Sequence, residues 1–189
     1  WTQVLAIAAV RDLESVRVFS RDKTKRETFA AEIAKEINCE VVAAESAEAC
    51  IRDADIAVTI TNSAEPVLFG DWLSPGTHIN ATGANGYARR ELDDAAVLRT
   101  SIMATDQRDQ AKVEARELID LAEAGSLAWN DVAEIGALLR GDFTGRVSDD
   151  QITLFKSLGI ALEDIAFGKM IYERAVAAGV GESFGPKKS

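Results

Sequence analysis

Residues 16–37 read VRVFSRDKTKRETFAAEIAKEI, and this stretch decides the fold class. Its first four residues, Val16–Phe19, are rich in strand formers and predict a short strand. Apolar side chains then recur every four residues, which predicts an amphipathic helix. These apolar positions are Phe29, Ile33 and Ile37. Thr24 and Glu27 have the spacing of a capping box, so we expect the helix to begin there. A strand followed by a helix is the repeating unit of an α/β fold.

The alternation of strand and helix continues along the chain. A short helix capped by Ser46 and a polar helical stretch over residues 107–124 lie between further apolar runs. These runs consist of Val, Ile and Ala rather than alternating apolar and polar residues, which is typical of parallel strands covered on both faces. The predicted strands are Glu40–Ala43, Ile56–Ile60, His78–Ala81, Ser101–Ala104 and Ile152–Phe155. The pattern predicts a doubly wound parallel sheet.

The two ends of the sequence make this Rossmann-type sheet look incomplete. Residues 2–10 have helical periodicity, yet no strand precedes them, whereas a doubly wound domain opens with a strand and a glycine-rich turn. A long helix over about residues 158–178 has an apolar stripe, so we expect it to pack on a second domain outside the chain. We therefore divide the chain into a Rossmann-type domain at residues 1–147, a strand and helix at 148–180, and a tail at 181–189.

Composition excludes several function classes. The net charge of −10 argues against nucleic-acid binding, which needs clustered Lys and Arg. We find no apolar run long enough to span a membrane and no secretory signal, so we expect a cytoplasmic protein that does not bind membranes. Cys39 and Cys50 are isolated, with only His78 as a possible imidazole partner, so neither a metal site nor a disulfide is indicated. We interpret His78, inside a β-rich run, as structural.

Ser20 and Arg21 follow the first predicted strand. In a Rossmann-type unit the residue at this place selects the adenosine ribose: an acidic residue binds a free 2′-hydroxyl, while small polar residues with Arg accept a 2′-phosphate. We therefore expect NADP(H) to be preferred, with NAD(H) still possible because Asp22 adds negative charge. The alternative is that Ser20 begins a turn and Arg21 is solvated.

Small polar residues follow two other strands. Thr61, Asn62 and Ser63 end one strand, and residues 80–85 contain a second group. Open α/β sheets bind ligands at the carboxyl ends of their strands, and small side chains let a cofactor approach the backbone. The alternative for the first group is a hydrophilic turn before Pro66.

Five ordered segments carry a more specific pattern. They are Val16–Arg21, Thr59–Pro66 with Leu68–Trp72, Pro75–Asn85, Arg90–Asp94 and Thr153–Asp164. Together they resemble the ornithine cyclodeaminase/mu-crystallin family, and several motifs at matching spacing are more specific than any one of them. In that family a Gly-x-Gly-x-Gln-Ala turn comes immediately before a segment like Trp1–Arg11. The resemblance thus implies an N-terminal substrate and dimerisation domain, and hence a homodimer, outside the sequence in hand.

The resemblance also implies roles for individual residues. Ser20 and Arg21 match the ribose selector. The other implied cofactor contacts are Thr61, Asn62, Ser63, Thr82, Ala84 and Ser157. Ser157 is also implied to lie near the substrate, and Asn85 falls where cyclodeaminases place a catalytic Asp. Glu114 matches a position that can face the substrate, although a solvated carboxylate on a helix is an equal interpretation.

Asn85 favours one reaction over another. An amide cannot exchange a proton as a carboxylate does, whereas imine reduction needs chiefly hydride delivery and orientation. We therefore expect an NAD(P)-dependent imine reductase or amino-acid dehydrogenase acting on a small 2-imino acid, with Asn85 and Ser157 orienting the reacting carbon. The alternatives are a cyclodeaminase that converts ornithine to proline and ammonia with recycled NAD, and a non-catalytic NADPH and small-ligand binder. We expect the 189-residue chain by itself to bind dinucleotide weakly and to be inactive.

Overall fold

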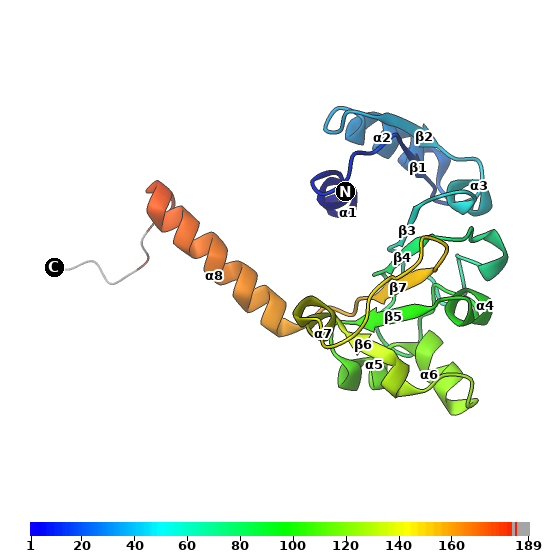
Figure 1. Cartoon of the computed structure of the whole chain (residues 1–189). Coiled ribbons are helices and arrows are strands. Elements are labelled where there is room, and N and C mark those ends of the chain that lie inside the picture. The colour runs from blue at the N-terminus through cyan, green and yellow to red at the C-terminus, as the bar shows by residue number, and fades with distance from the viewer. Residues whose placement is uncertain (183, 185–189) are drawn as a thin grey trace. The chain divides into compact units, whose positions relative to one another are not determined.

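The computed structural model describes residues 1–182 and 184, so most of the tail expected at 181–189 lies outside the described residues. Contacts divide the chain into two units, Trp1–Leu158 and Gly159–Ser189, and each is described here by itself (Figure 1). Within the described part, no helix is both long enough and apolar enough to cross a membrane.

The first unit contains two parallel sheets. A two-stranded sheet has the order β1-β2, and a five-stranded sheet has the order β3-β4-β7-β5-β6, with every neighbouring pair parallel (Figure 1). The strands are β1 (Ser15–Val18), β2 (Glu40–Ala43), β3 (Ile56–Thr59), β4 (His78–Ala81), β5 (Ile102–Thr105), β6 (Val132–Glu134) and β7 (Thr153–Lys156). The predicted α/β class with a parallel sheet is confirmed.

Helices connect these strands. The helices of the first unit are α1 (Thr2–Ala8), α2 (Lys23–Ile33), α3 (Ala47–Ile51), α4 (Asp94–Leu98), α5 (Arg108–Glu114), α6 (Arg116–Glu123) and α7 (Ile135–Arg140), with short 3-10 turns at Gly70–Trp72 and Trp129–Asp131. The side chain of Ser46 caps α3 as predicted, accepting a hydrogen bond from the Ala49 amide at 3.0 Å. The side chain of Asp93 caps α4 in the same way, accepting a hydrogen bond from the Ala96 amide at 2.8 Å.

The core of the first unit lies between the five-stranded sheet and helices α4 to α6. Alternate residues of β3, β4 and β7 are buried, so each of these strands has one face against the core. The large aliphatic side chains that are fully buried in this core are Leu68, Ile79, Leu92, Val97, Leu118, Val132 and Leu154. Burial of this apolar surface stabilises the packing of the sheet against the helices. The carboxyl ends of the strands are thereby held in fixed positions.

The start of α2 differs from the prediction. The helix begins at Lys23, and the Asp22 carboxylate accepts a hydrogen bond from the Lys25 amide at 3.0 Å. Asp is among the best N-cap residues, and it satisfies a helix-start amide two residues earlier than the expected Thr24–Glu27 box could. The capping-box prediction is therefore wrong, and the helix ends before Ile37.

The single helix expected over residues 107–124 is also wrong. It is interrupted at Ala115, whose φ of −88° and ψ of 79° are not helical, so α5 ends and α6 begins there. Ala115 is fully buried, and packing rather than propensity decides its conformation. Strand β6 and helix α7 were not predicted, because a strand of three residues shows no periodicity.

Four of the described strands, β1, β2, β3 and β6, lie at a sheet edge and have one partner each. β1 pairs with β2, and β3 pairs with β4, so one edge of each is open. An additional strand would complete a continuous Rossmann-type sheet at these edges, and its existence stays a prediction.

The second unit is dominated by one helix, α8 (Ala161–Ala178). It has no buried residue, and many of its large apolar side chains are exposed. They are Leu162, Ile165, Phe167, Ile171, Tyr172 and Val176. The expectation that this helix packs on another domain stays a prediction.

Candidate functional site

The carboxyl ends of three strands meet at one edge of the five-stranded sheet. The backbone amide of Thr82, just after β4, donates to the carbonyl of Thr59 at the end of β3, at 2.9 Å. The Thr82 hydroxyl donates to the same carbonyl at 3.2 Å. On the other side of β4, the Ser157 amide donates to the Ala81 carbonyl at 3.0 Å. The structure therefore brings the predicted residues Thr82 and Ser157 together with the β3 loop.

A fully buried carboxylate, Glu91, holds two of the loops at this edge. It accepts hydrogen bonds from the Thr59 hydroxyl at 3.1 Å and from the Thr61 amide at 2.5 Å. It also accepts from the amides of Gly83 at 2.8 Å and Ala84 at 3.1 Å. Charge-assisted bonds of this kind are stronger than bonds between neutral groups. One side chain thus fixes the loop after β3 to the loop after β4.

Glycine is required where these loops cross. A Cβ atom at Gly83 would lie 2.5 Å from both the Thr61 carbonyl oxygen and Glu91 Oε1, closer than real side chains allow. The amides of Thr61, Gly83 and Ala84 are already used by Glu91, so ligand contacts from these loops must come from their other groups. Glu91 lies in the family-like segment Arg90–Asp94, but its function could not be predicted, because a charged residue beside Leu92 gives no sign of distant partners.

A buried ion pair supports the other side of the β4 loop. Lys156 Nζ, at the end of β7, donates to the Ala84 carbonyl at 2.6 Å and lies 3.2 Å from Glu117 Oε1 on α6. Both charged side chains are fully buried. The Ala84 backbone is thereby held through its amide by Glu91 and through its carbonyl by Lys156. Neither Lys156 nor Glu117 was assigned a function from the sequence.

A second buried carboxylate holds Ser157. Asp106, directly after β5, accepts from the Ser157 hydroxyl at 3.1 Å and from the Leu158 amide at 2.5 Å. The hydroxyl of this predicted catalytic and cofactor residue is thus oriented by the neighbouring strand. An acidic residue at a strand's carboxyl end was the available signal, and sequence reasoning missed it.

The predicted ribose selector lies apart, at the end of β1 in the two-stranded sheet. The Ser20 hydroxyl donates to the Asp22 carbonyl at 3.0 Å. Arg21 is exposed and makes no hydrogen bond or ion pair with the residues that the structure describes. The buried Arg26, which sequence reasoning missed, donates to the Ser20 carbonyl at 3.0 Å and lies over the Phe19 ring at 5.3 Å. Arg26 therefore fixes the backbone from which Arg21 projects.

Three further predicted cofactor contacts, Thr61, Asn62 and Ser63, lie in the loop after β3. The Thr61 hydroxyl accepts from the Ser63 amide at 3.2 Å, and the Ser63 hydroxyl donates to the Glu65 carbonyl at 2.7 Å. The segment is thus a local turn, as the alternative interpretation expected, and it leaves Asn62 exposed.

Two predicted substrate residues remain. Asn85 is exposed, immediately after the fixed Ala84. Glu114 lies at the end of α5 and accepts from Gln110 Nε2 at 3.2 Å. In the described part of the chain, no hydrogen bond or ion pair joins Glu114 to the residues at the sheet edge.

His78 lies at the opposite, amino end of β4. Its ring is within hydrogen-bond distance of Thr153 Oγ1 at 2.7 Å and Asn80 Oδ1 at 3.2 Å. Burial lowers the pKa of His78 below its ordinary value, so the neutral ring is favoured. These contacts agree with the structural interpretation of His78.

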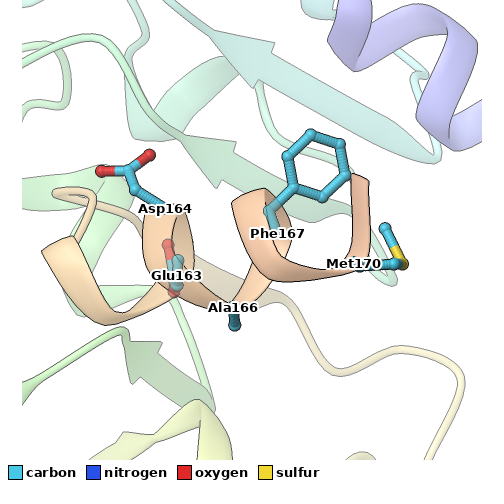
Figure 2. Close-up of a pocket in the computed structure, with 5 residues that line it drawn as sticks. All are labelled: Glu163, Asp164, Ala166, Phe167 and Met170. Atoms are coloured by element: carbon cyan, nitrogen blue, oxygen red, sulfur yellow. The ribbon is translucent and has the colours of Figure 1, made fainter. Parts of the chain in front are cut away.

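Helix α8 carries a shallow hollow of its own. The residues that line it are Glu163, Asp164, Ala166, Phe167 and Met170, and all of them belong to α8 (Figure 2). A hollow on one helix lacks the walls of a ligand pocket, and we assign it no site.

The Ornithine cyclodeaminase/mu-crystallin family profile matches residues 1–179. The chain belongs to the ornithine cyclodeaminase/mu-crystallin family. The family predicted from the ordered sequence motifs is thereby confirmed.

Individual members of the family agree in sequence and structure. The Delta(1)-pyrroline-2-carboxylate reductase of Bacillus cereus is 36% identical over 178 residues, which are 94% of this chain and 54% of that protein. The structure of Thermococcus litoralis Delta(1)-pyrroline-2-carboxylate reductase in complex with NADH and L-proline has a TM-score of 0.89 at 33% identity, covering 97% of this chain and 57% of the other. An archaeal alanine dehydrogenase dimer with bound NAD has a TM-score of 0.84 at 33% identity, covering 97% and 56%. This family member therefore spans a little over half the length of these relatives.

Proposed function

We propose that this chain forms the dinucleotide-binding part of an NAD(P)-dependent reductase that transfers hydride to a small 2-imino acid. The names of the similar proteins support this: one relative is a pyrroline-2-carboxylate reductase, and two structural neighbours contain NADH or NAD. The observation that carries the proposal is the Glu91 carboxylate, which holds the loops after β3 and β4 together at the edge where open α/β sheets bind ligands.

The sheet edge is suited to a dinucleotide. The exposed Thr61 and Asn62 offer a hydroxyl and an amide to ribose or pyrophosphate, and Gly83 allows the loop that carries them to approach the loop after β4. Thr82, Ala84 and the oriented Ser157 lie farther along the same edge and would contact the nicotinamide. When bound, the reduced cofactor supplies the hydride.

Arg21, one of the two predicted ribose-selecting residues, favours a cofactor with a 2′-phosphate. Arg21 is exposed and has no partner among the described residues, so its guanidinium is available to a 2′-phosphate. The Asp22 carboxylate caps α2 and accepts from the Lys25 amide, which partly offsets its negative charge. We therefore propose NADP(H) as the preferred cofactor, with NAD(H) also accepted.

Asn85 separates the reductase from a cyclodeaminase. It is exposed next to the held Ala84, and its amide can orient a substrate by hydrogen bonds but cannot take up a proton as a carboxylate does. Reduction of an imine that is already formed needs no such base. In this proposal Asn85 and Ser157 orient the reacting carbon, while Glu114 is a weaker candidate for a substrate contact.

The assembly proposed for the whole protein is a cytoplasmic homodimer. An alanine dehydrogenase dimer among the structural neighbours supports the dimer. We propose that residues 1–147 form the dinucleotide-binding domain, and that residues 148–180 lead to a substrate and dimerisation domain. The exposed apolar side chains of α8 support such a contact.

The test is turnover by the complete gene product that contains this sequence. We expect pyrroline-2-carboxylate or piperideine-2-carboxylate to cause stoichiometric oxidation of NADPH, measured by the loss of nicotinamide absorbance. Release of ammonia from ornithine without net NADPH consumption would favour the cyclodeaminase instead. Binding of NADPH without turnover of any imino acid in the panel would favour a non-catalytic binder.

A further inference from the structure

The peptide between Ala84 and Asn85 has a fixed orientation. Its carbonyl accepts a hydrogen bond from Lys156 Nζ, which is fully buried. The peptide is trans, as are all peptides in the described chain, so its N–H points opposite to its carbonyl. The Asn85 N–H therefore points away from the buried lysine.

The Asn85 amide differs from the two amides before it. Gly83 and Ala84 donate their N–H groups to Glu91, whereas the Asn85 N–H makes no hydrogen bond within the described residues. Asn85 is exposed, while Ala84 is only 2% exposed. An oriented and unused backbone donor thus stands directly after two occupied ones, in the loop that follows β4.

The buried ion pair costs more than an apolar pair of similar volume would. Transferring two charges out of water carries a large desolvation penalty, and well-packed apolar replacements are often as stable or more stable. The Lys156 and Glu117 side chains are both fully buried, and the ammonium group also bonds the Ala84 carbonyl. Orientation of that peptide is a function that an apolar pair could not perform.

From these contacts we infer that Lys156, held by Glu117, is a positioning residue that presents the Asn85 backbone N–H to an acceptor oxygen of the bound reactants. This inference rests on the proposed function and adds a binding group to the same site. An amide donor recognises a carbonyl or carboxylate oxygen. The acceptor is the carboxamide oxygen of nicotinamide or a carboxylate oxygen of the imino acid, and the two sources can be separated by experiment.

The first measurement is hydrogen exchange at the Asn85 amide in the complete gene product. We expect slower exchange on addition of NADPH alone if the cofactor supplies the acceptor. Slower exchange only after L-proline is added to the NADPH complex identifies the carboxylate instead. An Asn85 amide whose exchange is unchanged in a complex that demonstrably binds both molecules overturns the inference and leaves the proposed reductase intact. Failure of the wild-type protein to bind NADPH overturns both.

The second measurement compares Lys156→Met, Glu117→Met and the double variant. The single changes leave one buried charge and should destabilise the protein, whereas the double change should restore the unfolding midpoint. We expect the double variant to remain impaired by about tenfold in kcat/KM, the scale of one charge-assisted hydrogen bond. Full recovery of kcat/KM together with stability would show a structural role only and overturn the inference. Thr77→Val, which removes a buried hydroxyl from the amino end of β4, is the matched control.

Discussion

Glu91 Oε2 lies 2.8 Å from the backbone nitrogen of Gly83 and accepts its hydrogen. The same carboxylate accepts the Thr61 amide from the loop after the neighbouring strand. Two loops that are separate in sequence therefore depend on one buried charge. A site assembled in this way is sensitive to changes at Glu91 even though this side chain is fully buried and need not touch a ligand.

Glu91→Gln should weaken both folding and cofactor binding. A glutamine brings an N–H₂ group into a place where amide donors already converge, so at least one donor loses its acceptor. We expect the free energy of unfolding to fall by about 1.5–3 kcal/mol, measured by urea denaturation. NADPH affinity should fall as well, whereas the control Thr77→Val should lose stability alone. Unchanged NADPH affinity in a folded Glu91→Gln protein would contradict this view of the sheet edge.

Gly83→Ala tests the close approach of the two loops. The added methyl group would overlap the Thr61 carbonyl and Glu91 Oε1, each 2.5 Å from the ideal Cβ position. Relieving that overlap should cost about 1–3 kcal/mol of stability and move the loops apart. Gly145→Ala is the matched control, since no atom lies within 4 Å of its ideal Cβ. Thermal unfolding of both variants measures the difference, and equal midpoints would refute the expected strain.

The sequence predicted the strands better than the site. Residues with high strand propensity located Glu40–Ala43 and His78–Ala81 with the observed bounds, although only the second of these strands contains buried residues. The contacts of Glu91 have no comparable signature in the local sequence. Its partners lie between 7 and 32 residues away, and a single sequence does not reveal which distant amides a carboxylate meets.

Partners that are distant in sequence also explain why no function was predicted for Lys156 and Arg26. Lys156 stands beside Ser157 in the segment Thr153–Asp164, yet its ion partner Glu117 is on α6, which the sequence did not separate from α5. Arg26 was assigned no function from the sequence, although its buried side chain lies over the Phe19 ring and donates to the Ser20 carbonyl. Charged residues are mostly exposed, so composition alone assigns each of these side chains to the surface.

The single histidine of the sequence should make stability depend on pH. Burial lowers the pKa of His78 in the folded protein from an ordinary value of 6.5. Below about pH 6.5 the unfolded chain binds a proton that the folded protein does not, so stability is full above that pH and is lost as the pH falls toward the folded pKa. We expect the unfolding midpoint to decrease between about pH 7.5 and 5.5, where carboxylates change little. His78→Gln should flatten this dependence, and an identical slope in the variant would assign it to other groups.

Arg21→Ala should change which cofactor is preferred. The guanidinium is exposed on backbone held by Arg26, and a 2′-phosphate would be its charged partner. We expect the affinity for NADPH to fall about tenfold and that for NADH to stay within about twofold, since only NADPH carries the 2′-phosphate. Fluorescence titration of the complete gene product with each cofactor measures both affinities. Lys25→Ala removes an exposed charge from α2, which begins two residues after Arg21, and controls for general electrostatic attraction. Equal losses for both cofactors, or the same loss in Lys25→Ala, would mean that Arg21 does not select the ribose.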